Sequence, residues 1–276
     1  MIRETAPAKI NLALHVTGQR DDGYHLLDSL VVFAGAGDSL DILPAHDLSL
    51  SVTGPLAAGV PTGSDNLVLQ AAALFGPGPG AAITLDKLLP HAAGIGGGSA
   101  DAAAALRGLS RAWGQPLPTL NQILTLGADV PVCLLPTPQR MQGIGEALSF
   151  VPPLPPLFAV LVNPRVTVPT GPVFGGLERK ENPAMEPPAW SGFAAFIHWL
   201  ARQRNDLESP AQVLAPAIGD ALAALRDAGA DLARMSGSGA TCFGLFETAE
   251  RAEQVAWSIR GREPQWWVQD TVILTS

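Results

Sequence analysis

The 276-residue sequence has few cysteines, few charges and no long apolar run. Cys133 and Cys242 are the two cysteines, and neither has another Cys or a His nearby at the spacing of zinc ligands, so no metal framework is expected. Both lie in apolar runs, which favours buried thiols in a reducing compartment over disulfide or redox roles. No apolar stretch reaches the ~18 residues of a membrane span, and Arg3, Glu4 and Lys9 stand where a secretory leader would be apolar. We therefore expect a cytoplasmic protein without a membrane partner.

The charge of the chain argues against nucleic acids and anionic membranes as partners. Charged residues make up 15% of the sequence, against about 25% in typical proteins, and hydrophobic residues 47%, so we expect a compact globular protein. The formal net charge is −8, and no basic stripe is present. Nucleic acids and anionic membranes select clustered Lys and Arg, so the expected partner is a small molecule. The composition is compatible with a monomer or a homodimer.

The length predicts two domains, at about 150 residues per domain, although one large domain stays possible. Residues 151–157 contain four prolines in seven positions, too many for a regular element. We therefore predict an N-terminal domain over residues 1–153 and a C-terminal domain over residues 154–276.

The order of elements follows from periodicity and from breaker residues. Residues 8–16 alternate strictly in polarity, which predicts a half-buried strand with Lys9 and Asn11 on one face. A glycine-rich loop at 94–98 lies between a predicted strand and an Ala-rich helix that opens at Ser99 and runs to about residue 113. The other predicted elements are strands at 26–33, 81–89, 158–162, 242–246 and 267–274, a β-like region at 38–52, and helices at 66–75, 190–204, 211–229 and 250–259.

The glycine-rich segment Gly94-Ile95-Gly96-Gly97-Gly98-Ser99 is the first candidate site. A glycine turn that enters a helix presents free backbone N–H groups, and the helix dipole adds positive charge, so such a segment suits phosphate. The loop lacks the lysine of a P-loop, and Ser99 stands where a dinucleotide fingerprint needs its third glycine. A tight loop whose glycines serve packing alone is the alternative.

Lys9 and Asp129 are the second candidate site. Lys9 is one of three lysines, and on a strand face it could stabilise charge that develops on phosphoryl oxygens. Asp129 is a lone carboxylate among apolar residues, where burial is costly unless the group is paired or used. If the two meet, the aspartate could accept a hydroxyl proton while the lysine keeps it ionised. The alternatives are an exposed strand lysine and an aspartate that caps a helix broken at Pro131.

Tyr24 and His25 follow a turn, where a polar aromatic pair could contact a heterocycle or merely decorate a hairpin. Taken together, these segments resemble the superfamily of galactokinase, homoserine kinase, mevalonate kinase and phosphomevalonate kinase. Within it the sequence is most similar to the 4-diphosphocytidyl-2-C-methyl-D-erythritol kinase family. The matching segments span nearly the whole chain in the family's order: 7–12 (PAKINL), 22–25 (DGYH), 89–103, 127–131 (GADVP), 143–146 (GIGE), 204–208 (RNDLE) and 235–241 (MSGSGAT).

The resemblance implies transfer of the γ-phosphate of ATP, with Mg²⁺ as cofactor, to the 2-hydroxyl of the methylerythritol unit in the non-mevalonate route to isoprenoid precursors. It implies that Asp129 is the catalytic base and Lys9 its charge-stabilising partner. The residues implied to bind the acceptor are Asn11, Tyr24 stacking on cytosine, His25 reading its polar edge, Thr170, and Phe174 closing the other face. Those implied to bind ATP are Pro90, His91, Ala92, Ala93, Gly94, Ile95, Gly96, Gly97, Gly98, Ser99 and Ala100, with Ser99 also a candidate Mg²⁺ ligand.

Two departures from the family's pattern concern the phosphate loop. The family commonly has Leu and a second Ser where this chain has Ile95 and Ala100, so hydroxyl binding of Mg²⁺ falls to Ser99 alone. The residues 91–93 before the loop are also unusual and could alter adenine or ribose contacts. We expect activity to survive both departures.

The implied fold is α+β with two domains: an N-terminal half of the ribosomal-protein S5 type, and a C-terminal half whose helices back an antiparallel sheet. ATP and acceptor would meet in a cleft between them. A sister kinase for homoserine, mevalonate or a sugar is the nearest alternative, and residues 22–25 argue against it. A nicotinamide oxidoreductase, weakened by the absent third glycine, and a non-catalytic nucleotide sensor are the remaining alternatives.

Overall fold

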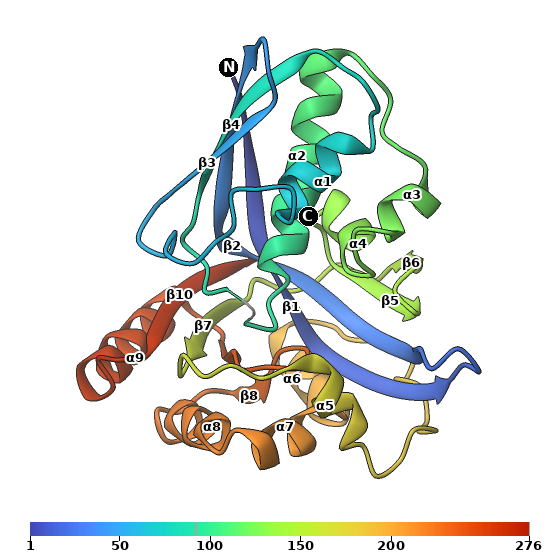
Figure 1. Ribbon diagram of the computed structural model, residues 1–276. Helices are drawn as coiled ribbons and strands as arrows, with labels where there is room; N and C mark the ends of the chain where they lie inside the picture. Colours follow the sequence, from blue (N-terminus) through green and yellow to red (C-terminus); the bar gives the residue numbers. More distant parts are fainter. Residues whose placement is uncertain (92, 276) are drawn as a thin grey trace. The chain divides into compact units, whose positions relative to one another are not determined.

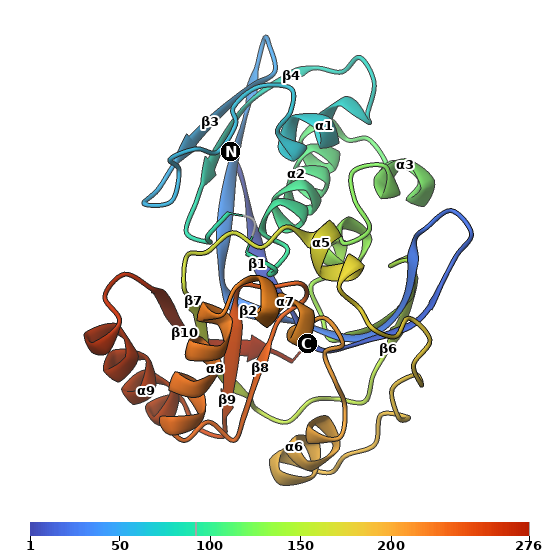
Figure 2. The same cartoon turned by 60° about the horizontal axis from the view of Figure 1, so that its bottom comes forward.

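The computed structural model describes residues 1–91 and 93–275. These residues form two compact units that interleave along the chain (Figures 1 and 2). Unit 1 contains Met1–Lys9, Gly37–His91 and Gly96–Pro136, and unit 2 contains Ile10–Ala36, Ala92–Ile95 and Thr137–Ser276. Two long strands, β1 (Ile2–Gln19) and β2 (His25–Ala45), therefore contribute residues to both units.

Unit 1 is a small sheet with helices. The end of β2 pairs antiparallel with β4 (Gly80–Asp86), with Ile42 opposite Ile83, and β3 (Ser49–Thr53) runs parallel to β4. Helix α2 (Gly97–Trp113) packs against α1 (Leu67–Ala73) and α4 (Val130–Leu134), and α3 (Leu120–Leu124) packs on α4. Gly108 allows α2 to approach the sheet, because a Cβ there would lie 2.4 Å from Ile42 Cδ1.

Unit 2 is built on an antiparallel sheet. The middle of β2, at Phe33 and Ala34, pairs with β10 (Trp267–Leu274), and the order continues through β7 (Phe158–Asn163), β9 (Cys242–Phe246) and β8 (Leu232–Met235). Strand β5 (Gln139–Gly143) also pairs with β2 and forms a hairpin with β6 (Ala147–Phe150). Helices α8 (Ala217–Asp227) and α9 (Ala249–Arg262) pack on this sheet, as Figure 2 shows. The remaining helices are α5 (Thr170–Gly175), α6 (Phe193–Ala201) and α7 (Glu208–Leu214).

The predicted α+β class is confirmed, including an antiparallel sheet backed by helices in the C-terminal half of the chain. The division of the chain at residues 153 and 154 stays a prediction. Among the described residues, no helix is both long and apolar enough to cross a membrane.

The strand predicted at 8–16 is confirmed as part of β1, but the prediction that it is half-buried is wrong. Both faces of β1 are buried there, and the polar residues Lys9, Asn11 and His15 are at most 3% exposed. Alternating polarity identifies two faces, but it does not say that the polar face meets water. Partners elsewhere in the chain accompany the buried charge and ring, with Asp129 beside Lys9 and Pro183 O beside His15.

The single helix predicted at 211–229 is also wrong, because the chain forms α7 and α8 with a break at Ala215. The residue before a proline is disfavoured in α-helical geometry, and Pro216 follows directly. Helix α2 begins at Gly97, two residues before the predicted start. Five short elements were not predicted: the strands β5 and β6, which form a hairpin, and α3, α5 and β8.

Candidate active site

The contact between Lys9 and Asp129 is present in unit 1. Lys9 Nζ lies 2.8 Å from Asp129 Oδ2, and the two side chains are 4% and 37% exposed. Asp129 stands at the N-cap of α4, but its side chain makes no capping hydrogen bond. The carboxylate is thus held by a buried ammonium and is partly open to solvent, which leaves it able to accept a proton from a bound hydroxyl.

Gly96 packs directly against Lys9. The glycine has φ +61°, and a Cβ there would lie 3.0 Å from Lys9 Cβ and 3.2 Å from Lys9 Cε. It is also the N-cap of α2, a helix of 17 residues whose first-turn N–H groups have no partner within the helix. The ammonium of Lys9 and these N–H groups therefore come from adjoining parts of unit 1, and both favour bound negative charge.

The start of the glycine loop belongs to unit 2, where it packs against residues 236–241. Ser236 Oγ donates to Gly94 O at 3.0 Å, and Thr241 N donates to Ala93 O at 3.0 Å. Gly94 has φ +74°, and a Cβ there would lie 2.5 Å from Gly239 O, so this position requires glycine. The two glycine-rich segments of the sequence thus support one another.

Asn205 and Glu208 hold the second glycine-rich segment. Asn205 Nδ2 donates to Met235 O at 2.8 Å and to Gly237 O at 2.9 Å, and Glu208 Oε2 accepts from Met235 N at 2.8 Å. No role was predicted for these residues, although the motif at 204–208 was noticed. The signal was an amide and a carboxylate close together at the start of a helix.

A buried charge cluster, which the sequence did not predict, lies beside the first turn of α2 in unit 1. Lys87 Nζ donates to Asp38 Oδ2 at 2.5 Å and to Asp101 Oδ2 at 2.9 Å. Asp38 Oδ1 also accepts from the backbone N–H groups of Leu88 and Leu89. Burial, opposed by Lys87 and reinforced by Asp38, raises the pKa of Asp101 to about 7. A Cβ on Gly97 would lie 3.7 Å from Lys87 Nζ, so the cluster borders the glycine loop.

Asn11 lies in unit 2 and is fully buried. Its Nδ2 donates to Ser29 Oγ at 2.8 Å, and its backbone N donates to Ser236 Oγ at 3.1 Å. Its Oδ1 is buried without a hydrogen-bond partner among the described residues. Because a buried carbonyl oxygen seldom stays unpaired, this atom is a candidate acceptor for a ligand hydroxyl or amine.

His25 and Phe174 form a stacked ring pair in unit 2, with centroids 4.6 Å apart and planes inclined by 27°. His25 Nε2 is buried and has no partner among the described residues. Burial, followed by the charge of Lys180, lowers the pKa of His25, so the ring is neutral at neutral pH. Tyr24 is 60% exposed and makes no ring contact within the described part of the chain. Of the three aromatic residues predicted to bind cytosine, the structure brings two together.

The other predicted ligand-binding residues are placed as follows. Thr170 begins α5, and its Oγ1 lies 3.0 Å from Ser238 Oγ. His91 is exposed, Ile95 and Ala100 are buried, and Ser99 is half-buried in the first turn of α2. Ala92 lies outside the described residues.

The fit to Mg²⁺ depends on few protein ligands. In residues 1–91 and 93–275 no three His, Cys, Asp or Glu side chains gather as they would to hold a metal. Mg²⁺ bound with a nucleotide commonly keeps several waters and takes only one or two protein ligands besides phosphate oxygens. The half-buried hydroxyl of Ser99, at the helix start, is compatible with that mode.

Comparisons with known proteins agree on one family. The family model "GHMP kinases N terminal domain" matches residues 66–136, and "GHMP kinases C terminal" matches residues 183–261. A protein of Jannaschia sp. (strain CCS1) named 4-diphosphocytidyl-2-C-methyl-D-erythritol kinase is 59% identical, over 99% of this chain and 97% of its own length. One of the same name from Dinoroseobacter shibae is 60% identical, over 97% of this chain and 93% of its own.

Solved structures give the same assignment. A crystal structure of 4-(cytidine 5'-diphospho)-2C-methyl-D-erythritol kinase superimposes with a TM-score of 0.80 at 32% identity, covering all of both chains. A homoserine kinase from Cytophaga hutchinsonii has a TM-score of 0.69 at 17% identity, covering 100% of this chain and 95% of its own, and so shares the fold alone. The chain therefore belongs to the 4-diphosphocytidyl-2-C-methyl-D-erythritol kinase family of GHMP kinases.

Proposed function

We propose that this protein transfers the γ-phosphoryl group of ATP to the 2-hydroxyl of 4-diphosphocytidyl-2-C-methyl-D-erythritol, a step toward isoprenoid precursors. The observation that carries this proposal is the 2.8 Å pair of Lys9 and Asp129, in a chain of this kinase family. The pair supplies a base and a cation, which are the two groups that phosphoryl transfer to an alcohol needs from side chains.

In the reaction, the oxygen of the acceptor hydroxyl attacks the γ-phosphorus. Asp129 accepts the proton of that hydroxyl during the attack. The bond from the γ-phosphorus to the bridging oxygen of ADP breaks, and ADP leaves. Lys9, whose Nζ lies 2.8 Å from Asp129 Oδ2, stabilises charge on the transferring phosphoryl oxygens. The phosphoryl group thus passes directly from ATP to the acceptor, and no covalent enzyme intermediate forms.

The first turn of α2 holds the phosphates of ATP. Its backbone N–H groups are unpaired within the helix, and Gly96 lets the chain turn into the helix against Lys9. Mg²⁺, which the residues present would hold through Ser99, supplies further neutralisation of phosphate charge when bound. Ala100 contributes only its backbone, because it has no hydroxyl.

The acceptor's nucleotide is recognised by the residues around His25. The unpartnered Nε2 of His25 reads a polar edge of the base, and Phe174 lines one face of the site. The exposed ring of Tyr24 is free to stack on the base when the acceptor binds. The unpartnered Oδ1 of Asn11 receives a hydroxyl of the acceptor.

A coupled ADP-release assay with four acceptors tests the proposal. We expect turnover with 4-diphosphocytidyl-2-C-methyl-D-erythritol and none above background with homoserine, mevalonate or galactose. Turnover with one of those three alone would contradict the proposed acceptor and favour a sister kinase. ADP release that needs no acceptor would indicate an ATPase.

Cytoplasmic location and a monomeric or homodimeric state complete the proposal. The location rests on the composition of the chain and on the biosynthetic role of its relatives. Size-exclusion chromatography with light scattering distinguishes the monomer from the dimer.

A further inference from the structure

The residues after α5 form a strap, defined here as residues 177–187, which has no helix or strand and is fastened to β1. Asn182 donates twice to Val16 O, from its backbone N and from Nδ2, both at 3.1 Å. Pro183 O lies 3.1 Å from Nδ1 of the buried His15. These contacts fix the middle of the strap on the strand that leads into the β1–β2 hairpin.

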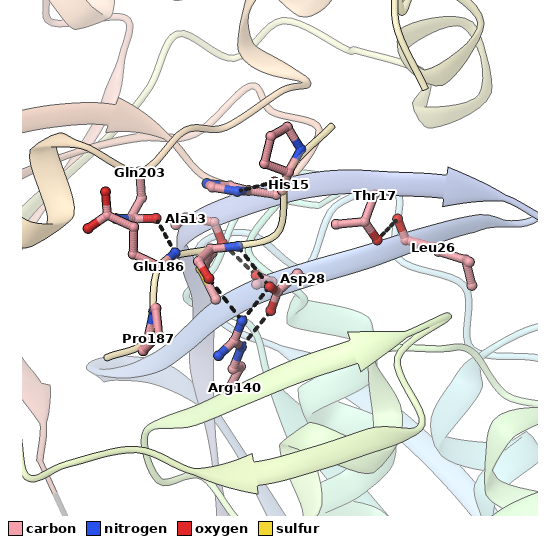
Figure 3. Close-up of polar contacts among 12 residues, drawn as sticks. Ala13, His15, Thr17, Leu26, Asp28, Arg140, Glu186, Pro187 and Gln203 are labelled. Atoms are coloured by element: carbon pink, nitrogen blue, oxygen red, sulfur yellow. Dashed lines mark hydrogen bonds and ion pairs between the residues drawn. The ribbon is translucent and has the colours of Figure 1, made fainter. Parts of the chain in front are cut away.

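A buried ion pair fastens the end of the strap (Figure 3). Arg140 donates from Nε and Nη2 to the two oxygens of Asp28, at 2.7 and 2.6 Å. Asp28 Oδ2 also accepts from Met185 N at 2.9 Å, and Arg140 Nη2 donates to Met185 O at 3.2 Å. Because Asp28 is 1% exposed, this bidentate pair is shielded from solvent, and the strap has little freedom to move there.

The strap brings Lys180 to the end of the hairpin. Lys180 Nζ donates to Gln19 Oε1 at 3.0 Å, and Gln19 Nε2 donates to Gly23 O at 3.0 Å, one residue before Tyr24. The ammonium also lies close enough to His25 for its charge to help lower the pKa of that ring. Lys180 is therefore a cation at the end of the hairpin, near enough to His25 for its charge to act on that ring.

Lys180 differs from the two other lysines in its partners. Lys9 and Lys87 are buried against carboxylates, whereas Lys180 contacts no carboxylate in the described part of the chain. A lysine ammonium has three N–H donors, and the contact with Gln19 uses one. Two donors and a full positive charge remain available to a ligand.

The negative charge of the hairpin turn suggests what the Lys180 ammonium does. Arg20 pairs with Asp22 at 2.7 Å, whereas Asp21 has no ion-pair partner in the part of the chain that the structure describes, in a protein of net charge −8. A ligand that carries a diphosphate would be repelled by this turn unless a cation stood beside it. Lys180 is the lysine in a position to provide that cation.

We propose that Lys180 is a further substrate-binding residue, which pairs with the diphosphate of the nucleotide acceptor while His25 and Phe174 receive its base. The inference rests on the proposed function, because it assumes a cytidine diphosphate at this ring pair. In such a ligand one ribose separates the base from the phosphates, so a cation next to the base site lies within reach of the phosphate charge. Lys180 then contributes to affinity for the acceptor and not to the chemical step.

The test compares Lys180→Met, Lys180→Arg and the control Arg226→Met. Arg226 is exposed on α8, and its substitution removes the same charge far along the chain from the strap. For each protein, kcat and the KM of ATP and of the acceptor are measured, with the inhibition constants of cytidine 5′-diphosphate and of cytidine. Thermal unfolding checks that each variant is folded.

For Lys180→Met we expect the acceptor KM and the inhibition constant of cytidine 5′-diphosphate to rise about fivefold or more, as for a lost charge-assisted hydrogen bond. We expect changes of no more than about twofold in the inhibition constant of cytidine, in the KM of ATP and in kcat. None of these depends on the contact between Lys180 and the diphosphate of the acceptor. Lys180→Arg restores most of the affinity, and Arg226→Met matches the wild type. Added salt weakens inhibition by cytidine 5′-diphosphate more in the wild type than in Lys180→Met.

The ratio of the two inhibition constants decides the inference. If Lys180→Met weakens inhibition by cytidine as much as inhibition by cytidine 5′-diphosphate, or weakens neither, Lys180 does not bind the diphosphate. Turnover of the acceptor by the wild type would then leave the proposed function intact. If neither nucleotide inhibits the wild type and the cytidylyl acceptor is not turned over, the proposed function fails and the inference fails with it.

Discussion

At the scale of single residues, the position of Lys9 depends on a neighbour without a side chain. Gly96 has φ +61°, a left-handed conformation that costs other residues about 1–2 kcal/mol, and its Cα faces the aliphatic part of Lys9. The lysine reaches Asp129 across this surface. A side chain at position 96 would therefore move the ammonium as well as strain the backbone.

We predict that Gly96→Ala lowers kcat about tenfold or more, because a displaced Lys9 no longer supports charge on the phosphoryl group. Gly114→Ala is the matched control, since Gly114 ends the same helix with φ +63° and has open space around a Cβ. Both variants should lose about 1–2 kcal/mol of unfolding free energy. Equal kcat values in the two variants would show that Gly96 does not position Lys9.

The sequence predicts a functional polar residue only where its immediate neighbours in the chain make it unusual. Asp129 is a carboxylate in an apolar run, which points to a partner, and the contact with Lys9 hypothesised from the sequence is present in the structure. The cluster of Asp38, Lys87 and Asp101 was not predicted, because its members lie up to 63 positions apart. Nothing in the neighbourhood of each residue indicates burial with the other two.

At the scale of elements, the β1–β2 hairpin is held by a histidine with both ring nitrogens engaged. His15 Nε2 accepts from Arg204 N at 2.9 Å, so Nδ1 carries the proton and donates to Pro183 O. Only the neutral ring satisfies both partners. Burial first, and then the charge of Arg204, lowers the pKa of His15 below its usual value of 6.5.

We predict that His15 makes the fold sensitive to mild acid. Because the pKa is lower in the folded chain than in the unfolded chain, the stabilisation by neutral His15 is complete above pH 6.5 and is lost as the pH falls from 6.5 through the folded-state pKa. Thermal unfolding between pH 7.5 and 5 should show a steeper loss of stability in the wild type than in His15→Gln. The exposed His46 provides the control, and His46→Gln should keep the wild-type slope. Parallel slopes for all three proteins would contradict the role of His15.

Prediction of elements succeeded where periodicity and breakers agreed. The strands at 242–246 and 267–274 have the predicted bounds, and the helix at 66–75 shrinks to Leu67–Ala73 behind its cap Asn66. The hairpin of β5 and β6 was missed because residues 139–150 mix polar and apolar positions, and pairing with β2 supplies what local propensity does not. Burial of both faces of β1 was likewise set by tertiary partners.

At the scale of the whole molecule, few charges are present, and three of them are buried together. Asp38, Lys87 and Asp101 are each at most 4% exposed and carry one negative charge in excess when all are ionised. Asp101 Oδ1 has no hydrogen-bond partner among the described residues, which adds to the cost of its ionised form. The folded chain therefore retains a proton on Asp101 to higher pH than the unfolded chain does.

We predict that Asp101→Asn reduces the loss of stability as the pH rises from about 4 through 7. A folded-state pKa of about 7 against 3.8 unfolded means that the contribution is complete below pH 3.8 and is lost as the pH rises through 7. Relative to Asp101→Asn, the melting temperature of the wild type should fall as the pH rises from 5 to 8, by about 2–4 °C for each kcal/mol involved. The slope should be shallower in Asp101→Asn and unchanged in Asp21→Asn, which alters an exposed turn. A steeper slope in Asp101→Asn would be inconsistent with a retained proton.

The central claim is that Asp129, held by Lys9, takes the proton of the acceptor hydroxyl during phosphoryl transfer. Rapid-quench single-turnover kinetics on wild type and Asp129→Asn, with ATP and 4-diphosphocytidyl-2-C-methyl-D-erythritol, measure that step directly. The account predicts that Asp129→Asn slows transfer about 10²-fold or more, while binding of both substrates changes by no more than about threefold. Transfer at the wild-type rate in folded Asp129→Asn would contradict it.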